Sequence, residues 1–296
     1  MLDYHIHLWP HGRRDTVPTI EELAAYCARA AEAGVTEIAL TEHLFRFVQA
    51  DALLHGFWAD DPDAGLRASM AQYWDDHARA DLDRYVSCVL EAKAAGLPVV
   101  LGLEVDYYRD RMGEVAALLA GYPFDVLLGS VHWVGASWRF DDLGDPLSMA
   151  QWSSRTVEGA WDDYTTALEE LAASGTCDVL AHPDLIKVTG RRPGEPEEFW
   201  DRMAEAAAAS GMAAEVSSAG WRKPAAEAYP APPLLARFAA RGVPFTTASD
   251  AHGLPGVAER AGDLVDLLRD AGVATLRAYR GRVPTEVPIA QEAGRR

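Results

Sequence analysis

The sequence predicts an α/β protein in which repeated βα units surround a parallel sheet. Short apolar or β-branched runs alternate with alanine-rich amphipathic stretches along the chain, which is the pattern that such units produce. Histidines and carboxylates follow the apolar runs, as expected of a barrel whose strand ends converge on one mouth. No internal repeat or linker interrupts the sequence, so we expect one domain over residues 1–296.

Seven short apolar runs are predicted as strands. They cover residues 2–7, 37–40, 99–105, 126–130, 179–181, 213–216 and 245–248. The first helix is clearly marked, because Thr19 and Glu22 form a capping box and Gly34 ends the pattern. Its apolar face comprises Leu23, Tyr26, Cys27, Ala30 and Ala31. Further helices are predicted over residues 78–95, 158–174, 197–210, 232–240 and 257–271.

Two long connections, about 45–76 and 135–156, interrupt this alternation. Connections of this length in a compact domain are usually lids or binding loops, and the alternative is that they tie down the rim of the barrel. Their tryptophans are either pocket walls or packing anchors; they are Trp58, Trp138 and Trp152. The terminal segment 282–296 is polar and contains proline, so we expect it to fray.

Composition restricts the class of protein. The chain has 296 residues and is 49% hydrophobic, which is enough for a sizeable core. It has no membrane-spanning apolar run and no signal-peptide pattern, so we expect a cytoplasmic protein. Cys27, Cys88 and Cys177 form no CxxC pair and are expected to be core residues. The net charge of -18 argues against nucleic acid as a partner and favours a small substrate.

Seven of the nine histidines lie at or just past the C-terminal end of a predicted strand. They are His5, His7, His11, His43, His132, His182 and His252. Glu104 and Asp250 occupy similar positions, and the strand period of two puts His5 and His7 on one face. Imidazoles with a few carboxylates suit Zn, Fe or Mn better than Mg or Ca. A single histidine at a strand end would usually be structural, but histidines at the ends of several successive strands predict a metal centre.

With these motifs in place, the sequence resembles the PHP (polymerase and histidinol phosphatase) superfamily of metal-dependent phosphoesterases, and within it the histidinol-phosphatase branch. The similarity runs from DYHIHLWPHG to ASDAHGLPGVAERAGD, nearly the whole chain. The segments LGLEVDYYRDRM, YPFDVLLGSVHWV and CDVLAHPDLIKVTGRRP are also similar, and EVSSAGWRKPAAEAYP is the most specific. The resemblance implies a distorted (β/α)7 barrel. It also implies hydrolysis of L-histidinol phosphate to L-histidinol and phosphate, in histidine biosynthesis.

The resemblance further implies a site for two or three divalent metal ions. The ligands of the first ion would be His5, His7, Glu104 and Asp250. Glu104 would bridge to a second ion, held also by His132 and His182. The ligands of the third would be His11, His43 and His252. We expect a hydroxide between the first two ions to attack phosphorus, and Asp250, His252 or a water to protonate the leaving group.

The sequence departs from the family pattern near the expected site. Glu42 stands where aspartate is common, so we expect it to accept a histidine N–H rather than bind metal. Ser217 stands where asparagine is usual, and Trp221 where leucine is usual. Both changes lie close to the expected substrate pocket.

Basic residues that follow the strands are the candidate phosphate ligands. Arg222 ranks first because a guanidinium matches phosphate bidentately, and Lys223 and Lys187 follow. The two lysines could equally be solvated surface residues. Asp106 and Asp184 would either orient ligand histidines or cap the turns that follow their strands.

Three other functions stay open at this point. The first is a PHP phosphatase that acts on another small phosphomonoester. The second is a PHP exonuclease, which needs a basic track for single strands that the charge balance does not provide. The third is an amidohydrolase-type barrel, whose usual bridging carbamylated lysine has no candidate at a strand end, where Glu104 stands instead.

Overall fold

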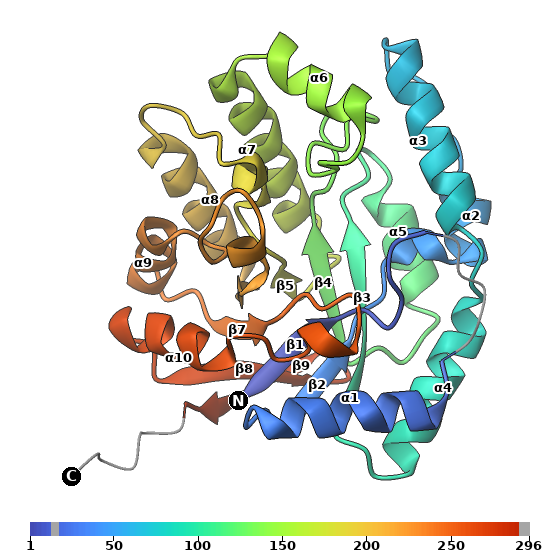
Figure 1. Ribbon diagram of the computed structural model, residues 1–296, viewed down its shortest axis with the longest axis vertical. Helices are drawn as coiled ribbons and strands as arrows, with labels where there is room; N and C mark the ends of the chain where they lie inside the picture. The colour runs from blue at the N-terminus through green and yellow to red at the C-terminus, as the bar shows by residue number, and fades with distance from the viewer. Residues whose placement is uncertain (13–17, 290–296) are drawn as a thin grey trace.

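The computed structural model describes residues 1–12 and 18–289. Its centre is a parallel sheet of seven strands in the order β1-β2-β3-β4-β5-β6-β7, nearly closed into a barrel (Figure 1). The strands are β1 (Leu2–Ile6), β2 (Glu37–Leu40), β3 (Val99–Asp106), β4 (Val126–Ser130), β5 (Val179–Leu180), β6 (Ala213–Ser217) and β7 (Phe245–Ala248). All seven predicted strands are confirmed, with ends that differ by at most one residue.

The barrel closes between β1 and β7 through single contacts rather than a continuous ladder. The His7 N–H donates to the carbonyl of Ala251 at 2.7 Å. The Asp3 carboxylate accepts from the Ser249 N–H and hydroxyl, both at 2.7 Å, and from the Ala258 N–H at 2.8 Å. These bonds fix the ends of β1 and β7 side by side, where several candidate ligands lie.

Helices cover the outside of the barrel (Figure 1). They are α1 (Ile20–Glu32), α4 (Leu82–Ala94), α5 (Met112–Leu119), α7 (Val157–Ala173), α8 (Glu197–Ser210), α9 (Pro232–Ala240) and α10 (Ala261–Asp270). The predicted capping box of α1 is present, since Thr19 Oγ1 accepts from the Glu22 N–H and Glu22 Oε2 from the Thr19 N–H. α4 begins four residues later than predicted because Asp81 is its N-cap and accepts from the Arg84 N–H. α10 also begins four residues late, and α5 was not predicted.

Both long connections contain helices, so their description as loops is wrong. They are α2 (Val48–Leu54), α3 (Ala64–His77) and α6 (Pro146–Ser154). Asp63 caps α3 by accepting from the N–H groups of Gly65 and Leu66, and Asp145 caps α6 just before Pro146. Asp63, Asp145 and Pro146, whose residue types are typical of loops, therefore stand at the N-termini of helices. Figure 1 shows α3 and α6 beyond the end of the sheet toward which β3 and β4 point.

Polar contacts join these two added helices. Ser69 Oγ on α3 donates to Asp145 Oδ2 at 2.9 Å, and the Gln151 amide on α6 donates to Asp63 at 3.1 Å. Arg139 donates to Ser69 and to Asp145. α3 and α6 thus form one connected rim.

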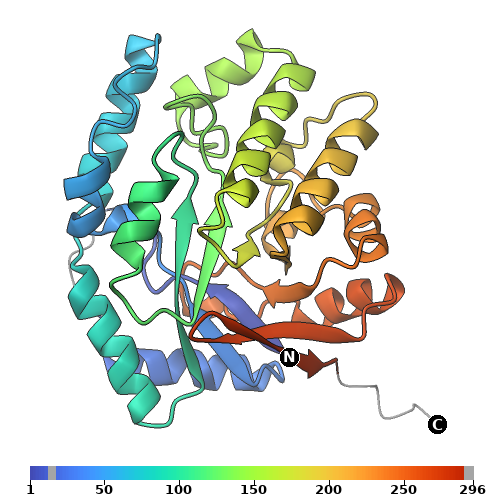
Figure 2. The same cartoon turned by 180° about the vertical axis from the view of Figure 1, so that it is seen from behind.

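The last two strands of the described residues form a hairpin at the opposite end of the barrel (Figure 2). It consists of antiparallel strands β8 (Thr275–Arg280) and β9 (Val283–Pro288). The Arg282 guanidinium binds Asp178 bidentately at 2.9 Å and donates to the Thr176 carbonyl, which fixes the turn against the start of β5. The expectation that residues from 282 onward fray is therefore wrong for β9, and 290–296 lie outside the described residues.

Two predictions from composition can be compared with the structure. Cys27, Cys88 and Cys177 are all free and buried, as expected. Within the described parts of the chain, no helix combines the length and the apolar character needed to cross a bilayer.

Candidate metal centre

The first cluster of donor atoms lies where β1 meets β7. The Nε2 atoms of His5 and His7 are 3.1 Å apart, and both side chains are fully buried. Asp250, just after β7, brings Oδ1 to 3.8 Å from the first of these nitrogens and 3.6 Å from the second. Glu104 Oε2 lies 3.3 and 3.5 Å from the same two atoms. The four side chains expected around the first ion are therefore close enough to share one.

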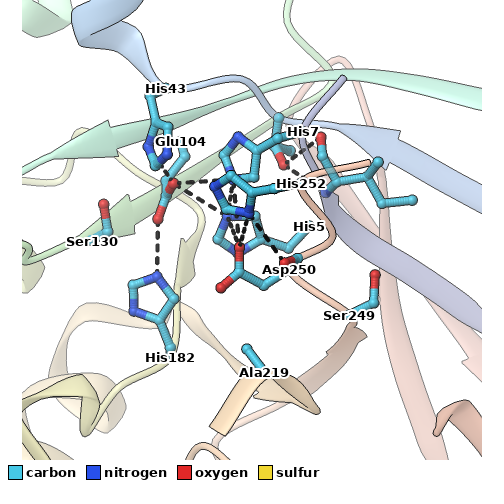
Figure 3. A network of polar contacts seen from close by, with 12 residues as sticks. His5, His7, His43, Glu104, Ser130, His182, Ala219, Ser249, Asp250 and His252 are labelled. Atoms are coloured by element: carbon cyan, nitrogen blue, oxygen red, sulfur yellow. Dashed lines mark hydrogen bonds and ion pairs between the residues drawn. The ribbon is translucent and has the colours of Figure 1, made fainter. Parts of the chain in front are cut away.

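Glu104 lies at the centre of the cluster, with its two carboxylate oxygens facing different imidazoles (Figure 3). Oε1 is 3.0 Å from His182 Nε2 and 3.5 Å from His132 Nε2. Oε2, which faces the first cluster, is also 2.7 Å from His43 Nδ1. A carboxylate placed in this way can bridge two ions.

A third group of imidazoles adjoins the first. Donor atoms of His7, His43 and His252 lie within 4.8 Å of one another. The His11 ring stacks on His252 with centroids 4.4 Å apart and lies 5.7 Å from His43. His11 is exposed, and partial desolvation by the surrounding protein, followed by the charges of His252 and Arg46, lowers the pKa of its imidazole. All nine predicted ligands therefore gather at one end of the barrel.

Two of these side chains are presented by left-handed backbone. His182 has φ 27° and Asp250 has φ 51°, a region that costs a residue other than glycine about 1 kcal/mol or more. Arg222 stabilises the second of these turns by donating to the carbonyls of Ser249 at 2.9 Å and Asp250 at 3.1 Å. Backbone strain of this kind is often found at functional sites.

Carboxylates behind the imidazoles hold their orientation. His5 Nδ1 is 2.8 Å from Glu215 Oε2, and His132 Nδ1 is 2.6 Å from Asp106 Oδ1. Glu42 differs from these two: it accepts from two main-chain N–H groups after β1, and its Oε2 lies 3.6 Å from His7 Nδ1, too far for the expected hydrogen bond, with Arg46 on its other side. In metal sites such bonds fix which ring nitrogen faces the ion.

The charges of the cluster fit a cation at its centre. Burial alone would raise the pKa of Glu104, but the imidazoles of His5, His43 and His132 hold it well below its ordinary value. Burial also opposes protonation of His5, yet Glu215 and Glu104 raise the pKa of His5 well above its ordinary value. The carboxylates therefore favour positive charge next to them.

Unpartnered buried atoms provide a second test of fit. Glu104 Oε2, His43 Nε2 and His252 Nε2 are buried and make no well-aligned hydrogen bond. Buried polar atoms in a folded protein almost always have a partner. Imidazole nitrogens and carboxylate oxygens left in this way are the donors that Zn, Fe or Mn prefer. The donor set therefore fits the metal ions that the resemblance implies.

A cavity of about 360 Å³ opens directly onto the cluster. Its aromatic and charged walls consist of Phe45, Tyr73, Trp133, Tyr229, Arg139, Asp141, Asp142 and Lys223. The three tryptophans of the long connections, Trp58, Trp138 and Trp152, are all buried and act as packing anchors instead. The ring centroids of Trp138 and Trp152 are 5.1 Å apart. Trp133 is the tryptophan that lines the cavity.

The three basic candidates lie in different surroundings. Lys223 is exposed and lines the cavity. The Arg222 guanidinium, which holds the turn after β7, also binds Glu259 at 2.6 Å. Lys187 is fully buried, with Nζ 2.8 Å from Asp184 and 2.7 Å from Glu227. The structure does not bring Lys187 to the cavity, so we do not retain it as a phosphate ligand.

Asp106 and Asp184, which had the same two expected roles, have different contacts. Asp106 orients His132, one of the two roles expected of it. Within residues 1–12 and 18–289, the Asp184 carboxylate pairs with no histidine side chain; it pairs with Lys187 and accepts from the Ala231 N–H at 2.9 Å. Asp184 therefore has a structural role.

Sequence reasoning missed three residues that support the site. Glu215 follows the strand-end rule but was not assigned a role. His77 lies far from any strand end, yet its Nε2 accepts from the Gly12 N–H at 3.0 Å and so holds the loop that carries His11. Arg46 donates to the Pro10 carbonyl of that loop at 2.9 Å. Nothing in the local sequence around His77 or Arg46 indicates these contacts.

Seven parallel strands with this set of imidazoles and carboxylates at their C-terminal ends define an α/β barrel whose mouth could hold metal ions. The chain belongs to the PHP domain family, whose profile matches residues 3–219. The family expected from the motifs is thereby confirmed.

Known relatives are similar over nearly their whole length. A probable histidinol-phosphatase of Deinococcus radiodurans is 32% identical over 282 residues, which cover 93% of this chain and 95% of the relative. The histidinol phosphate phosphatase of Lactococcus lactis, solved with zinc, L-histidinol and phosphate, superposes with a TM-score of 0.69 at 18% identity, covering 96% of this chain and 98% of that one. A putative histidinol phosphatase from Listeria monocytogenes gives 0.68 at 18% identity, with 89% and 99% covered. At this identity the two structures establish the fold.

Proposed function

We propose that this protein is a metal-dependent phosphomonoesterase that hydrolyses L-histidinol phosphate to L-histidinol and phosphate, in histidine biosynthesis. The placement of Glu104 carries the proposal, because its two oxygens face separate groups of histidines at the floor of a cavity. The name of the Deinococcus radiodurans relative supports the choice of substrate. Three free cysteines are consistent with a cytoplasmic location.

Two or three divalent ions, of Zn, Fe or Mn, would occupy the site. His5, His7, Glu104 and Asp250 would hold one ion. Glu104, His132 and His182 would hold another. The remaining imidazoles, His11, His43 and His252, would hold the third. When bound, such ions supply Lewis acidity that activates water and neutralises charge on the phosphoryl oxygens.

The residues of the chain provide orientation and charge around the phosphoryl group. Glu215 and Asp106 fix the rings of His5 and His132, so that Nε2 of each faces the cluster. Lys223 lines the cavity and is the best placed side chain to bind a phosphoryl oxygen. Arg222 contributes indirectly, by holding the carbonyl of Asp250.

A proton must reach the oxygen of the leaving alcohol. Asp250 and His252 both line the cavity, and His252 Nδ1 lies 3.5 Å from Asp250 Oδ1. These are the side chains from which that proton could be delivered, with a cavity water as the alternative.

A substrate panel tests the proposal. The protein loaded in turn with zinc, iron or manganese is assayed with L-histidinol phosphate, sugar phosphates and amino-alcohol phosphates. We expect kcat/KM for L-histidinol phosphate to exceed the others by at least about tenfold. Equal turnover of all phosphates in the panel would contradict the choice of L-histidinol phosphate and indicate a general phosphomonoesterase. Hydrolysis of amides or single-stranded DNA without monoesterase activity would overturn the whole proposal.

A further inference from the structure

We propose that Asp141 binds a cationic amine of the substrate and thereby makes the cavity selective for phosphomonoesters of 2-amino alcohols. The inference rests on the proposed phosphomonoesterase function and deepens it by naming a specificity-determining residue. Asp141 lies between β4 and α6 and lines the same cavity as His132 and Asp250. Its carboxylate is therefore close to the candidate metal centre but outside the set of ligands.

The other charges of this wall are already paired. Arg139 donates to Asp142 and to Asp145, both at 3.0 Å, and its guanidinium lies 4.3 Å from the centre of the Tyr73 ring. Asp142 also accepts from the Gly144 N–H at 3.1 Å. This group therefore offers little unsatisfied charge to a ligand.

Asp141 differs because its carboxylate has no side-chain partner. Across residues 1–12 and 18–289, no side chain forms a hydrogen bond or an ion pair with it. Burial raises the pKa of Asp141, although the charges of His132 and Lys223 act in the opposite direction. Asp141 is half-buried and its carboxylate accepts from its own main-chain N–H, but no cationic side chain pairs with it in the described residues, so a cation that reaches it in this cavity is stabilised.

The position of Asp141 fits the geometry of an amino-alcohol phosphate. In such a molecule only two carbons separate the amine from the ester oxygen, so the amine must bind close to the phosphoryl group. Asp141 lines the cavity together with His132 and Lys223, which belong to the proposed phosphoryl side, and together with Tyr73 and Tyr229. One cavity of about 360 Å³ therefore presents the carboxylate and the proposed phosphoryl groups to the same small ligand.

Aromatic rings next to this position suit a cationic and partly aromatic substrate. Phe45, Tyr73, Trp133 and Tyr229 line the cavity, and the Phe45 ring contacts those of Tyr73 at 5.4 Å and Trp133 at 6.2 Å. Ring faces attract ammonium groups and stack on imidazole. The rings and Asp141 together therefore favour an amine that also carries a flat side chain.

The test removes the amine from the substrate and the charge from the enzyme in turn. Wild-type and Asp141→Asn proteins, both metal-loaded, are assayed with L-histidinol phosphate and with 3-(imidazol-4-yl)propyl phosphate, which lacks only the amine. We expect wild type to prefer the amine-bearing substrate in kcat/KM, and this preference to fall roughly 10- to 100-fold in Asp141→Asn, the range for loss of a charged hydrogen bond. Asp142→Asn is the matched control and should keep most of the preference, because its carboxylate is paired with Arg139.

Two results would overturn the inference. A preference that survives in Asp141→Asn would show that the amine binds elsewhere. An equal loss on both substrates would assign Asp141 to the reaction itself rather than to amine binding. O-phosphoethanolamine and ethyl phosphate give the same comparison without imidazole, so the inference can fail or hold separately from the histidinol assignment. Calorimetric titration with L-histidinol and 3-(imidazol-4-yl)propan-1-ol repeats the comparison without turnover.

Discussion

Replacing Glu104 by glutamine removes the charge that lies between the groups of imidazoles and changes the volume very little. The carboxylate oxygens lie within 3.5 Å of five imidazole nitrogens, which belong to His5, His7, His43, His132 and His182. A carboxamide keeps one acceptor oxygen, so at most one of the two groups facing Glu104 retains it as a ligand. The Glu104→Gln protein should therefore lose at least one bound ion.

The size of the effect follows from Coulomb's law. Two unit charges about 4 Å apart interact by roughly 4 kcal/mol at an effective dielectric constant of about 20, and a divalent ion in direct contact interacts more strongly. A loss of about 4 kcal/mol corresponds to roughly 10³-fold, so we expect at least this decrease in the affinity for the bridged ion and in kcat/KM.

Metal stoichiometry by mass spectrometry and kcat/KM, measured on the same preparation, check this prediction. Circular dichroism should show a retained fold, because the substituted carboxamide fills the same space and keeps the packing of β3. Glu91→Gln, the same chemical change at an exposed position of α4, is the matched control and should behave as wild type. A Glu104→Gln protein with full metal content and wild-type kcat/KM would refute the bridging role.

Other perturbations have more limited expected effects. Glu215→Gln should weaken metal binding roughly 10- to 100-fold by releasing His5, and unchanged affinity in a chelator competition would contradict that role. Tyr85→Phe should lower the free energy of unfolding in urea by about 1 to 3 kcal/mol, because its buried hydroxyl donates to main-chain carbonyls of β2 and β3. Arg282→Met should cost about 1 kcal/mol, since its ion pair with Asp178 is partly exposed. Metal removal should lower the melting temperature, because ions bind only the folded chain; an unchanged transition would argue against a metal centre.

The strands and the candidate ligands could be predicted because local rules determine both. A strand period of two places His5 and His7 on one face, and parallel strands place their C-terminal ends together. Glu104 and Asp250 therefore needed only correct strand ends to be brought into one cluster. The structure adds the distances, and with them the finding that His7 lies between the first and third groups.

The errors arose where contacts distant in sequence determine the outcome. Lys187 follows β5 as a surface lysine would, but Asp184, Glu227 and the carbonyl of Ala228 stabilise its burial. Asp63 and Asp145 belong to turn-rich segments in which no helix was predicted; they cap α3 and α6, and these two helices are joined by contacts distant in sequence, such as that of Ser69 with Asp145. No local pattern contains that information.

Arg222 was expected to bind phosphate directly, but its contacts give it a different role. A guanidinium beside a phosphate site suggests direct phosphate binding, but here it donates to the carbonyls of Ser249 and Asp250 and binds Glu259. These bonds hold Asp250 in the left-handed backbone that presents its carboxylate to His5 and to the centre of the cluster. In the proposed function, the positive charge that faces the phosphoryl group would then come from bound ions and Lys223, and Asp141 would supply the negative charge for the other end of the substrate.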